Sequence, residues 1–86
     1  MPGARVNFEE LRAFALHLNS VIDQLTDIES TTNSKLDSLD WDDDVFRRFE
    51  QQYRDGIRPF KNLKGTLEEF IKFLNDKAND LERYHS

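Results

Sequence analysis

The chain has 86 residues, a net charge of −5 and no cysteine. This length suggests one small domain near the lower limit for a self-sufficient core, without a disulfide or a thiolate metal site to reinforce it. The negative charge disfavours nonspecific binding to nucleic acid. No stretch approaches the roughly 20 apolar residues of a membrane span, and the N-terminal residues lack the apolar segment of a conventional signal peptide.

The charge is divided unevenly along the sequence. Before Val45 there are 3 bases and 10 acids, whereas from Val45 onward there are 9 bases and 7 acids. One stretch of the second half gathers six of the bases: Arg47, Arg48, Arg54, Arg58, Lys61 and Lys64. We expect the basic second half to complement the acidic first half within one fold, and a dedicated anion site is the alternative.

The first half predicts one long helix over about residues 8–39, which Asn7 can cap at its start. Apolar residues recur there at steps of three and four, as on the a and d positions of a heptad: Leu11, Phe14, Leu18, Val21, Leu25 and Ile28. Such spacing is typical of an amphipathic helix. Residues 30–34 are poor helix formers. We interpret them as a frayed or bent continuation of the helix, with a break as the alternative.

The second half predicts a longer helix, over about residues 43–84. Its a positions repeat every seven residues and its d positions interleave with them: Phe46, Phe49, Tyr53, Phe60, Leu63, Leu67, Phe70, Leu74, Leu81 and Tyr84. Pro59 lies inside this pattern. Because proline removes a backbone hydrogen bond and crowds the preceding turn, we expect a bend near residues 56–59 rather than two separate helices.

Between the two helices, residues 40–42 predict a turn. Asp42 can cap the second helix, with Asp43 and Asp44 in its first turn, where acids interact favourably with the helix dipole. A short turn between two long helices forces them to run antiparallel. We therefore expect residues 1–86 to form a single all-α domain, an antiparallel two-helix hairpin of the helix-turn-helix type.

Both apolar stripes are too wide for one partner helix. The e positions add a further row: Ala15, Ile22, Leu36, Ile57, Ile71 and Ala78. Two g positions of the second half are also apolar, Val45 and Phe73. A single helix cannot cover faces this broad, and the simplest closure is a dimer of hairpins, a four-helix bundle. We expect eleven residues to form the core and the dimer interface: Leu18, Ile22, Leu25, Phe46, Phe49, Tyr53, Phe60, Leu67, Phe70, Ile71 and Leu74.

The sequence contains no persuasive arrangement for catalysis, cofactor binding or metal binding. Asp40, Asp42 and Asp44 match the first three ligand positions of an EF-hand loop. However, position 6 is Val45 instead of glycine, and position 12 is Gln51 instead of glutamate. There is no phosphate-binding glycine loop and no nucleophile elbow. We expect a non-enzymatic protein without a cofactor or a metal.

The length, the two amphipathic helices and the central Trp41-Asp42-Asp43 resemble the Trp-Xaa-Gly family, the small ESAT-like substrates of type VII secretion. The resemblance covers nearly the whole chain in architecture, whereas the local motif is short. It implies a hairpin that pairs with its own copy or with a related hairpin, without enzymatic activity. It also implies synthesis in the cytoplasm, followed by export without a cleaved signal peptide through a machine driven by a membrane ATPase.

The sequence departs from this family at two places. The glycine of the motif is Asp43, and the C-terminal Tyr-x-x-x-Asp/Glu export element is not met, because Tyr53 is followed four residues later by Ile57. The alternatives are a divergent branch with another signal, a cytoplasmic partner of an exported protein, or a coiled-coil adaptor unrelated to secretion. Trp41 either caps its own hairpin or engages a secretion component.

Overall fold

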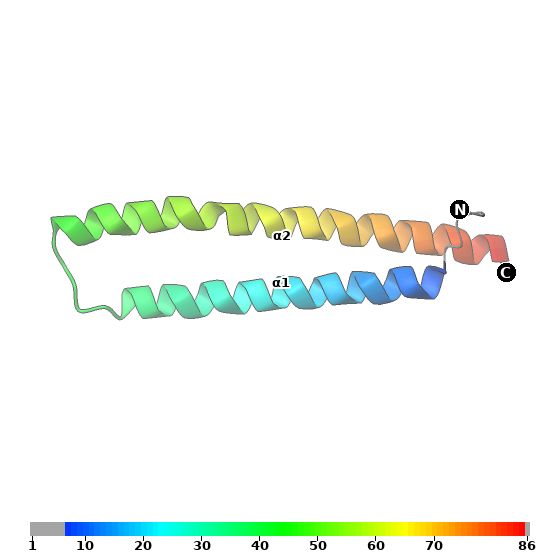
Figure 1. The fold of residues 1–86 in the computed structure, drawn as a ribbon, viewed down its shortest axis with the longest axis horizontal. Coiled ribbons are helices and arrows are strands. Elements are labelled where there is room, and N and C mark those ends of the chain that lie inside the picture. The colour runs from blue at the N-terminus through cyan, green and yellow to red at the C-terminus, as the bar shows by residue number, and fades with distance from the viewer. Residues whose placement is uncertain (1–6, 86) are drawn as a thin grey trace, which may run out of the picture.

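The computed structural model describes residues 7–85, which form two long α-helices and the connection between them. α1 spans Phe8–Asp37 and α2 spans Asp44–His85. They lie side by side and run in opposite directions, so the start of α1 and the end of α2 meet at one end of the molecule (Figure 1). The predicted helical hairpin is confirmed. The rod measures 64 × 20 × 20 Å, and its length matches the ~63 Å of a 42-residue helix.

α1 begins at the predicted cap. Asn7 Oδ1 accepts a hydrogen bond from the Glu9 N–H at 2.9 Å, which satisfies one of the free amides of the first turn. At the other end, Ser38 closes the helix. Its N–H donates to the Ser34 carbonyl at 3.1 Å, and its hydroxyl donates to the Lys35 carbonyl at 2.9 Å.

Residues 30–34 stay helical, although their intrinsic helix propensity is low. Packing against α2 supplies the missing stability, because Thr32 within this stretch is half-buried and Leu36, two residues after it, is buried. Tertiary contacts of an amphipathic face routinely outweigh propensity in this way. α1 therefore runs without a break to Asp37.

α2 begins at a different cap from the predicted one. Asp43 Oδ1 accepts a hydrogen bond from the Phe46 N–H at 2.8 Å, and the Asp43 carbonyl accepts one from the Arg47 N–H at 3.1 Å. The prediction of Asp42 as the cap is therefore wrong. Each of the three consecutive aspartates could cap the helix. In the structure Asp43 is the cap, and the residue whose amide it binds, Phe46, is half-buried in the helix packing.

Pro59 does not interrupt α2, which is one continuous helix from Asp44 to His85. The proline and Asp55 are both exposed, so water can reach the Asp55 carbonyl that lacks an amide partner at Pro59. In Figure 1 the axis of α2 changes direction only gently in this region.

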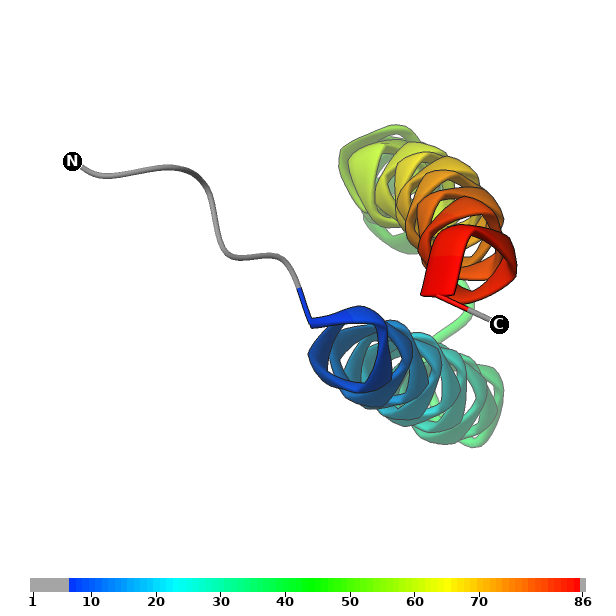
Figure 2. The same cartoon turned by 90° about the vertical axis from the view of Figure 1, so that its right-hand side faces the viewer.

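The helices pack along a narrow seam that uses the a and e rows of the two heptad patterns, rather than the a and d rows. Among the described residues, five apolar side chains are buried in it: Ala15, Leu18, Leu36, Leu67 and Ala78. Small alanines in the e rows let the helices approach each other. The end-on view shows two helices side by side and no further layer (Figure 2). The d rows therefore flank the seam instead of filling it.

Candidate interaction surfaces

The tip of the hairpin, residues 38–43, holds Trp41 against the first turns of α2. Its ring centroid lies 5.2 Å from that of Phe46 and 5.9 Å from that of Phe49. Trp41 nevertheless keeps 37% of its surface exposed. The indole therefore packs on its own hairpin and still presents a part of its surface to solvent or to a partner.

The three residues of the turn motif have separate contacts. The pKa of the Asp43 carboxyl is lowered, chiefly by the hydrogen bond from the Phe46 amide, with a further contribution from the Trp41 side chain. Asp42 lies 3.8 Å from the Arg47 guanidinium and is almost fully exposed. The structure thus joins Trp41 and Asp43 at the start of α2, while Asp42 faces outward.

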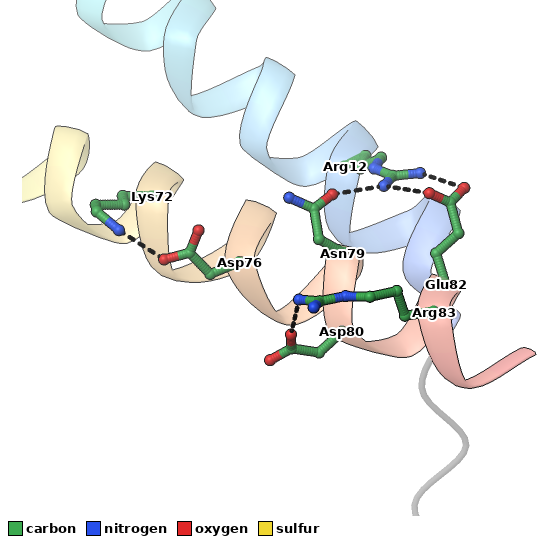
Figure 3. Close-up of polar contacts among 7 residues, drawn as sticks. All are labelled: Arg12, Lys72, Asp76, Asn79, Asp80, Glu82 and Arg83. Atoms are coloured by element: carbon green, nitrogen blue, oxygen red, sulfur yellow. Dashed lines mark hydrogen bonds and ion pairs between the residues drawn. The ribbon is translucent and has the colours of Figure 1, made fainter.

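One side of the hairpin is crossed by polar contacts between the helices. At the free end, the guanidinium of Arg12 on α1 donates to Asn79 Oδ1 at 2.7 Å and to both carboxylate oxygens of Glu82 at 3.1 Å (Figure 3). This fork raises the pKa of Arg12 and lowers the pKa of Glu82. Towards the tip, the Tyr53 hydroxyl donates to Asn33 Oδ1 at 2.9 Å. We call this side the polar face.

A charged pair lies at the edge of the seam on the polar face. The Lys64 ammonium is 2.9 Å from Glu29 Oε1 and 3.4 Å from the hydroxyl of Thr26. Glu29 is buried, and its Oε1 has no partner with hydrogen-bond geometry among residues 7–85. The pair is therefore held together by charge, with a carboxylate that is incompletely satisfied.

The opposite side of the hairpin is apolar. A groove of about 340 Å³ with an entirely apolar lining runs over the seam there, between Phe14, Leu18, Leu67, Phe70, Phe73 and Leu74. Spacings of seven residues extend this surface along both helices. We call it the apolar face and define it by six residues: Phe14, Val21, Ile28, Leu63, Phe70 and Phe73.

The apolar face is largely open to solvent. Phe14 is 54% exposed, Phe70 52% and Phe73 71%. In the middle of the face, the residues three or four positions away on each helix are uncharged or histidine: His17, Gln24, Thr31, Pro59 and Thr66. Charged residues lie beside Phe73 at one end of the face: Glu69, Asp76 and Lys77. An exposed apolar surface with few charges at its middle resembles the core of an interface in composition.

The eleven residues expected in the core and interface divide between these regions. Eight are buried or half-buried along the seam: Leu18, Ile22, Leu25, Phe46, Tyr53, Leu67, Ile71 and Leu74. Phe49, Phe60 and Phe70 are exposed. The expected set omitted Phe14 and Phe73, which line the groove, and the Glu29–Lys64 pair. Phe14 stands in the d row of the first stripe and Phe73 at a g position beside the second, so the pattern marked both as apolar without placing them at the groove.

Within residues 7–85, no group of three or more histidine and acidic side chains is placed to hold a metal ion. Neither helix of this described part contains an apolar stretch that could cross a bilayer. Comparisons of the chain with known protein families, with curated proteins and with solved structures found no match.

Proposed function

We propose that this chain is a non-enzymatic interaction protein whose apolar face binds a second helical hairpin, its own copy or a related chain, in a four-helix bundle. One observation carries the proposal. Phe14, Phe70 and Phe73 surround an apolar groove and remain at least half exposed in the single hairpin. Removing such surface from water is the main driving force of protein association.

The dimensions of the hairpin favour a long partner over a short peptide. The six residues that define the apolar face run over about 21 Å of α1, from Phe14 to Ile28, whereas the rod is 64 Å long and 20 Å wide. A standard stable interface buries about 800 Å² on each partner, so it must extend along the rod beyond these six residues. A second hairpin of similar length can do so and complete a four-helix bundle.

Sedimentation equilibrium with circular dichroism on the same sample tests this proposal. We expect a highly helical species of about 20 kDa, twice the 10.2 kDa of the chain. Phe70→Glu places a charge on the apolar face and should give the single-chain mass. The matched control is Leu16→Glu, since Leu16 is exposed but lies two residues, or about 200°, round the helix from Phe14.

A well-folded wild-type monomer at micromolar concentration would contradict the proposal, and so would equal disruption by the two glutamate variants. A chain that is poorly helical alone but becomes helical with a related hairpin would assign the apolar face to a heterodimer. In that case Phe70→Glu should prevent the gain of helix, while Leu16→Glu should not.

A role in type VII-like secretion, as substrate or as partner of a substrate, is a second candidate. Trp41 at the turn of a helical hairpin favours it, because the indole keeps more than a third of its surface available for a secretion component. The competing candidate is an adaptor that docks onto a larger assembly through the same hairpin.

Export of a tagged chain from a bacterium that carries such a machine separates these candidates. Secretion into the medium that depends on the machine's ATPase would support the first, and retention in the cells would contradict it. Trp41→Ala refines the result. An intact dimer that is no longer exported indicates recognition of Trp41, whereas loss of folding indicates that Trp41 serves its own hairpin.

A further inference from the structure

We propose that the polar face carries a binding site for a short acidic polypeptide segment, centred on Arg54, Arg58 and Lys61. These three side chains line a groove of about 190 Å³ between the helices, together with Asn33, Tyr53 and Ile57. From the sequence, the basic stretch of α2 could either complement the acidic first half of the chain or form an anion site. The groove supports an anion site for these three residues.

The three bases form one stripe. Their spacings of four and three residues place them on one side of α2, and all three are exposed. From Arg54 to Lys61 the stripe covers about 10 Å along the helix axis. The hydrogen bond between Tyr53 and Asn33 joins the two helices beside it. Because the stripe stands on rigid helix, the charges have fixed spacings that a partner can match.

The charges of this stripe are only weakly neutralised within the chain. Arg54 and Arg58 each have a single exposed contact of 3.4 Å, to Glu50 and Asp55 respectively. Within residues 7–85, Lys61 has no ion pair. Exposed pairs of this kind contribute little to stability, and a guanidinium can exchange them for a two-point contact with a partner carboxylate.

The neighbouring charges limit the length of the ligand. Seven residues before Arg54, Arg47 is already occupied by Asp42 and Asp44. Seven residues after Lys61, the same row continues with Glu68. A nucleic-acid duplex or an anionic bilayer would extend its charge over these acids, whereas a segment with two or three carboxylates one helical turn apart would not.

This site is independent of the proposed dimer. The groove lies on the opposite side of the seam from the apolar face, so it stays open when a second hairpin covers that face. Each bundle of two copies would therefore carry two such grooves on its outside.

Fluorescence anisotropy with a labelled peptide tests the site on the full chain. The probe is a peptide of about 14 residues, ~21 Å when helical, with glutamates at spacings of four and three. A peptide with glutamine at these positions is the control probe. Arg54→Gln, Arg58→Gln and Lys61→Gln together should weaken binding at least about tenfold, as expected from the loss of three exposed charge contacts.

The control variant changes Arg48, Lys72 and Arg83 to glutamine, which removes the same charge from exposed positions outside the groove. We expect it to bind within about twofold of wild type at moderate salt. Equal weakening by both variants, or binding of the glutamine peptide as tight as that of the glutamate peptide, would overturn the proposal.

Tighter binding of duplex DNA or of phosphatidylserine vesicles through the same three residues would also overturn it, since the ligand would then be a different macromolecule. Circular dichroism checks that each variant keeps its helices. If the triple variant loses helix, the peptide affinities of Arg58→Gln and Arg48→Gln are compared instead, since each variant removes a single charge, inside and outside the groove respectively.

Discussion

The polar face and the apolar face of this hairpin flank the same seam, yet they differ in how far their side chains contact the other helix. On the polar face, Arg12 reaches Asn79 and Glu82, and Tyr53 reaches Asn33, so several polar side chains of one helix pair with those of the other. On the apolar face, phenylalanines surround an open groove. The difference teaches that a single hairpin already joins its helices by polar contacts on one side, whereas on the other side its apolar surface stays exposed to water.

Two leucines four residues apart on α2 give the largest expected contrast. Leu67 is 8% exposed in the seam, and Leu63 is 43% exposed on the apolar face. Leu67→Ala should lower the free energy of unfolding by about 2–3 kcal/mol. Leu63→Ala should cost less than about 1 kcal/mol in an isolated hairpin, but as much as Leu67→Ala when a partner covers the face.

Urea denaturation followed by circular dichroism, at a low and a high protein concentration, measures both variants. A Leu63→Ala penalty that grows with concentration supports a covered apolar face. A small penalty at every concentration would contradict a covered apolar face, because Leu63 would then stay exposed to water in the protein at high concentration as well.

The Glu29–Lys64 pair gives the next largest effect. Lys64→Leu leaves a buried carboxylate without its cation and should destabilise the hairpin by about 1–3 kcal/mol. Glu29→Leu combined with Lys64→Leu should recover this loss or exceed the wild-type stability. Thermal unfolding of the single and double variants measures it, and a double variant as unstable as Lys64→Leu would contradict this account.

Substitutions at the two glycines of α2 compare a position on the apolar face with a position outside it, and their expected effect is smaller. A Cβ added at Gly56, on the row of Leu63, or at Gly65, on a different row, meets no atom within 4 Å. Each alanine variant should therefore stabilise an isolated helix by about 0.5–1 kcal/mol. If a partner helix covers the apolar face closely, Gly56→Ala should lose this gain while Gly65→Ala keeps it. Equal gains in the associated protein would argue against close approach at Gly56.

Acid gives the smallest expected effect. The carboxyls of Asp43 and Glu82 have pKa values below their ordinary 3.8 and 4.5. Because the folded state binds these protons more weakly than the unfolded state, their contribution is complete above those ordinary values and is lost as the pH falls through the lowered pKa values. The melting temperature should therefore fall as the pH is taken from about 5 to 3.

Asp43→Asn with Glu82→Gln removes both titrations, and asparagine is still a good helix cap. The variant should show a shallower fall in melting temperature over the same pH range. An unchanged slope would mean that other carboxylates set the acid dependence.

The hairpin itself could be predicted from the sequence, because heptad spacing and a short acidic turn leave few other arrangements. The rows that meet in the seam could not, since the d and e rows beside each a row are both apolar. Packing decides between them: Ala15 and Ala78 admit a close neighbour, whereas Phe14 and Phe70 are too large and stay outside. The cap at Asp43 was hidden for a similar reason, because its neighbours are also aspartates.

The pair of buried Glu29 and half-buried Lys64 also favours one alignment of the helices. The apolar rows repeat every seven residues, so a slip of α2 by one heptad, about 10 Å, would exchange Leu67 for Phe60 or Leu74 and, in one direction, Ala78 for Ile71, all of them apolar. The six-residue connection, residues 38–43, can extend about 20 Å and would not prevent it. The slip would, however, set the Glu29 carboxylate against Ile57 or Ile71, where nothing pairs with its charge. This pair thus favours the observed register, together with the Arg12 and Tyr53 contacts, over others that the seven-residue repeat of apolar side chains would allow.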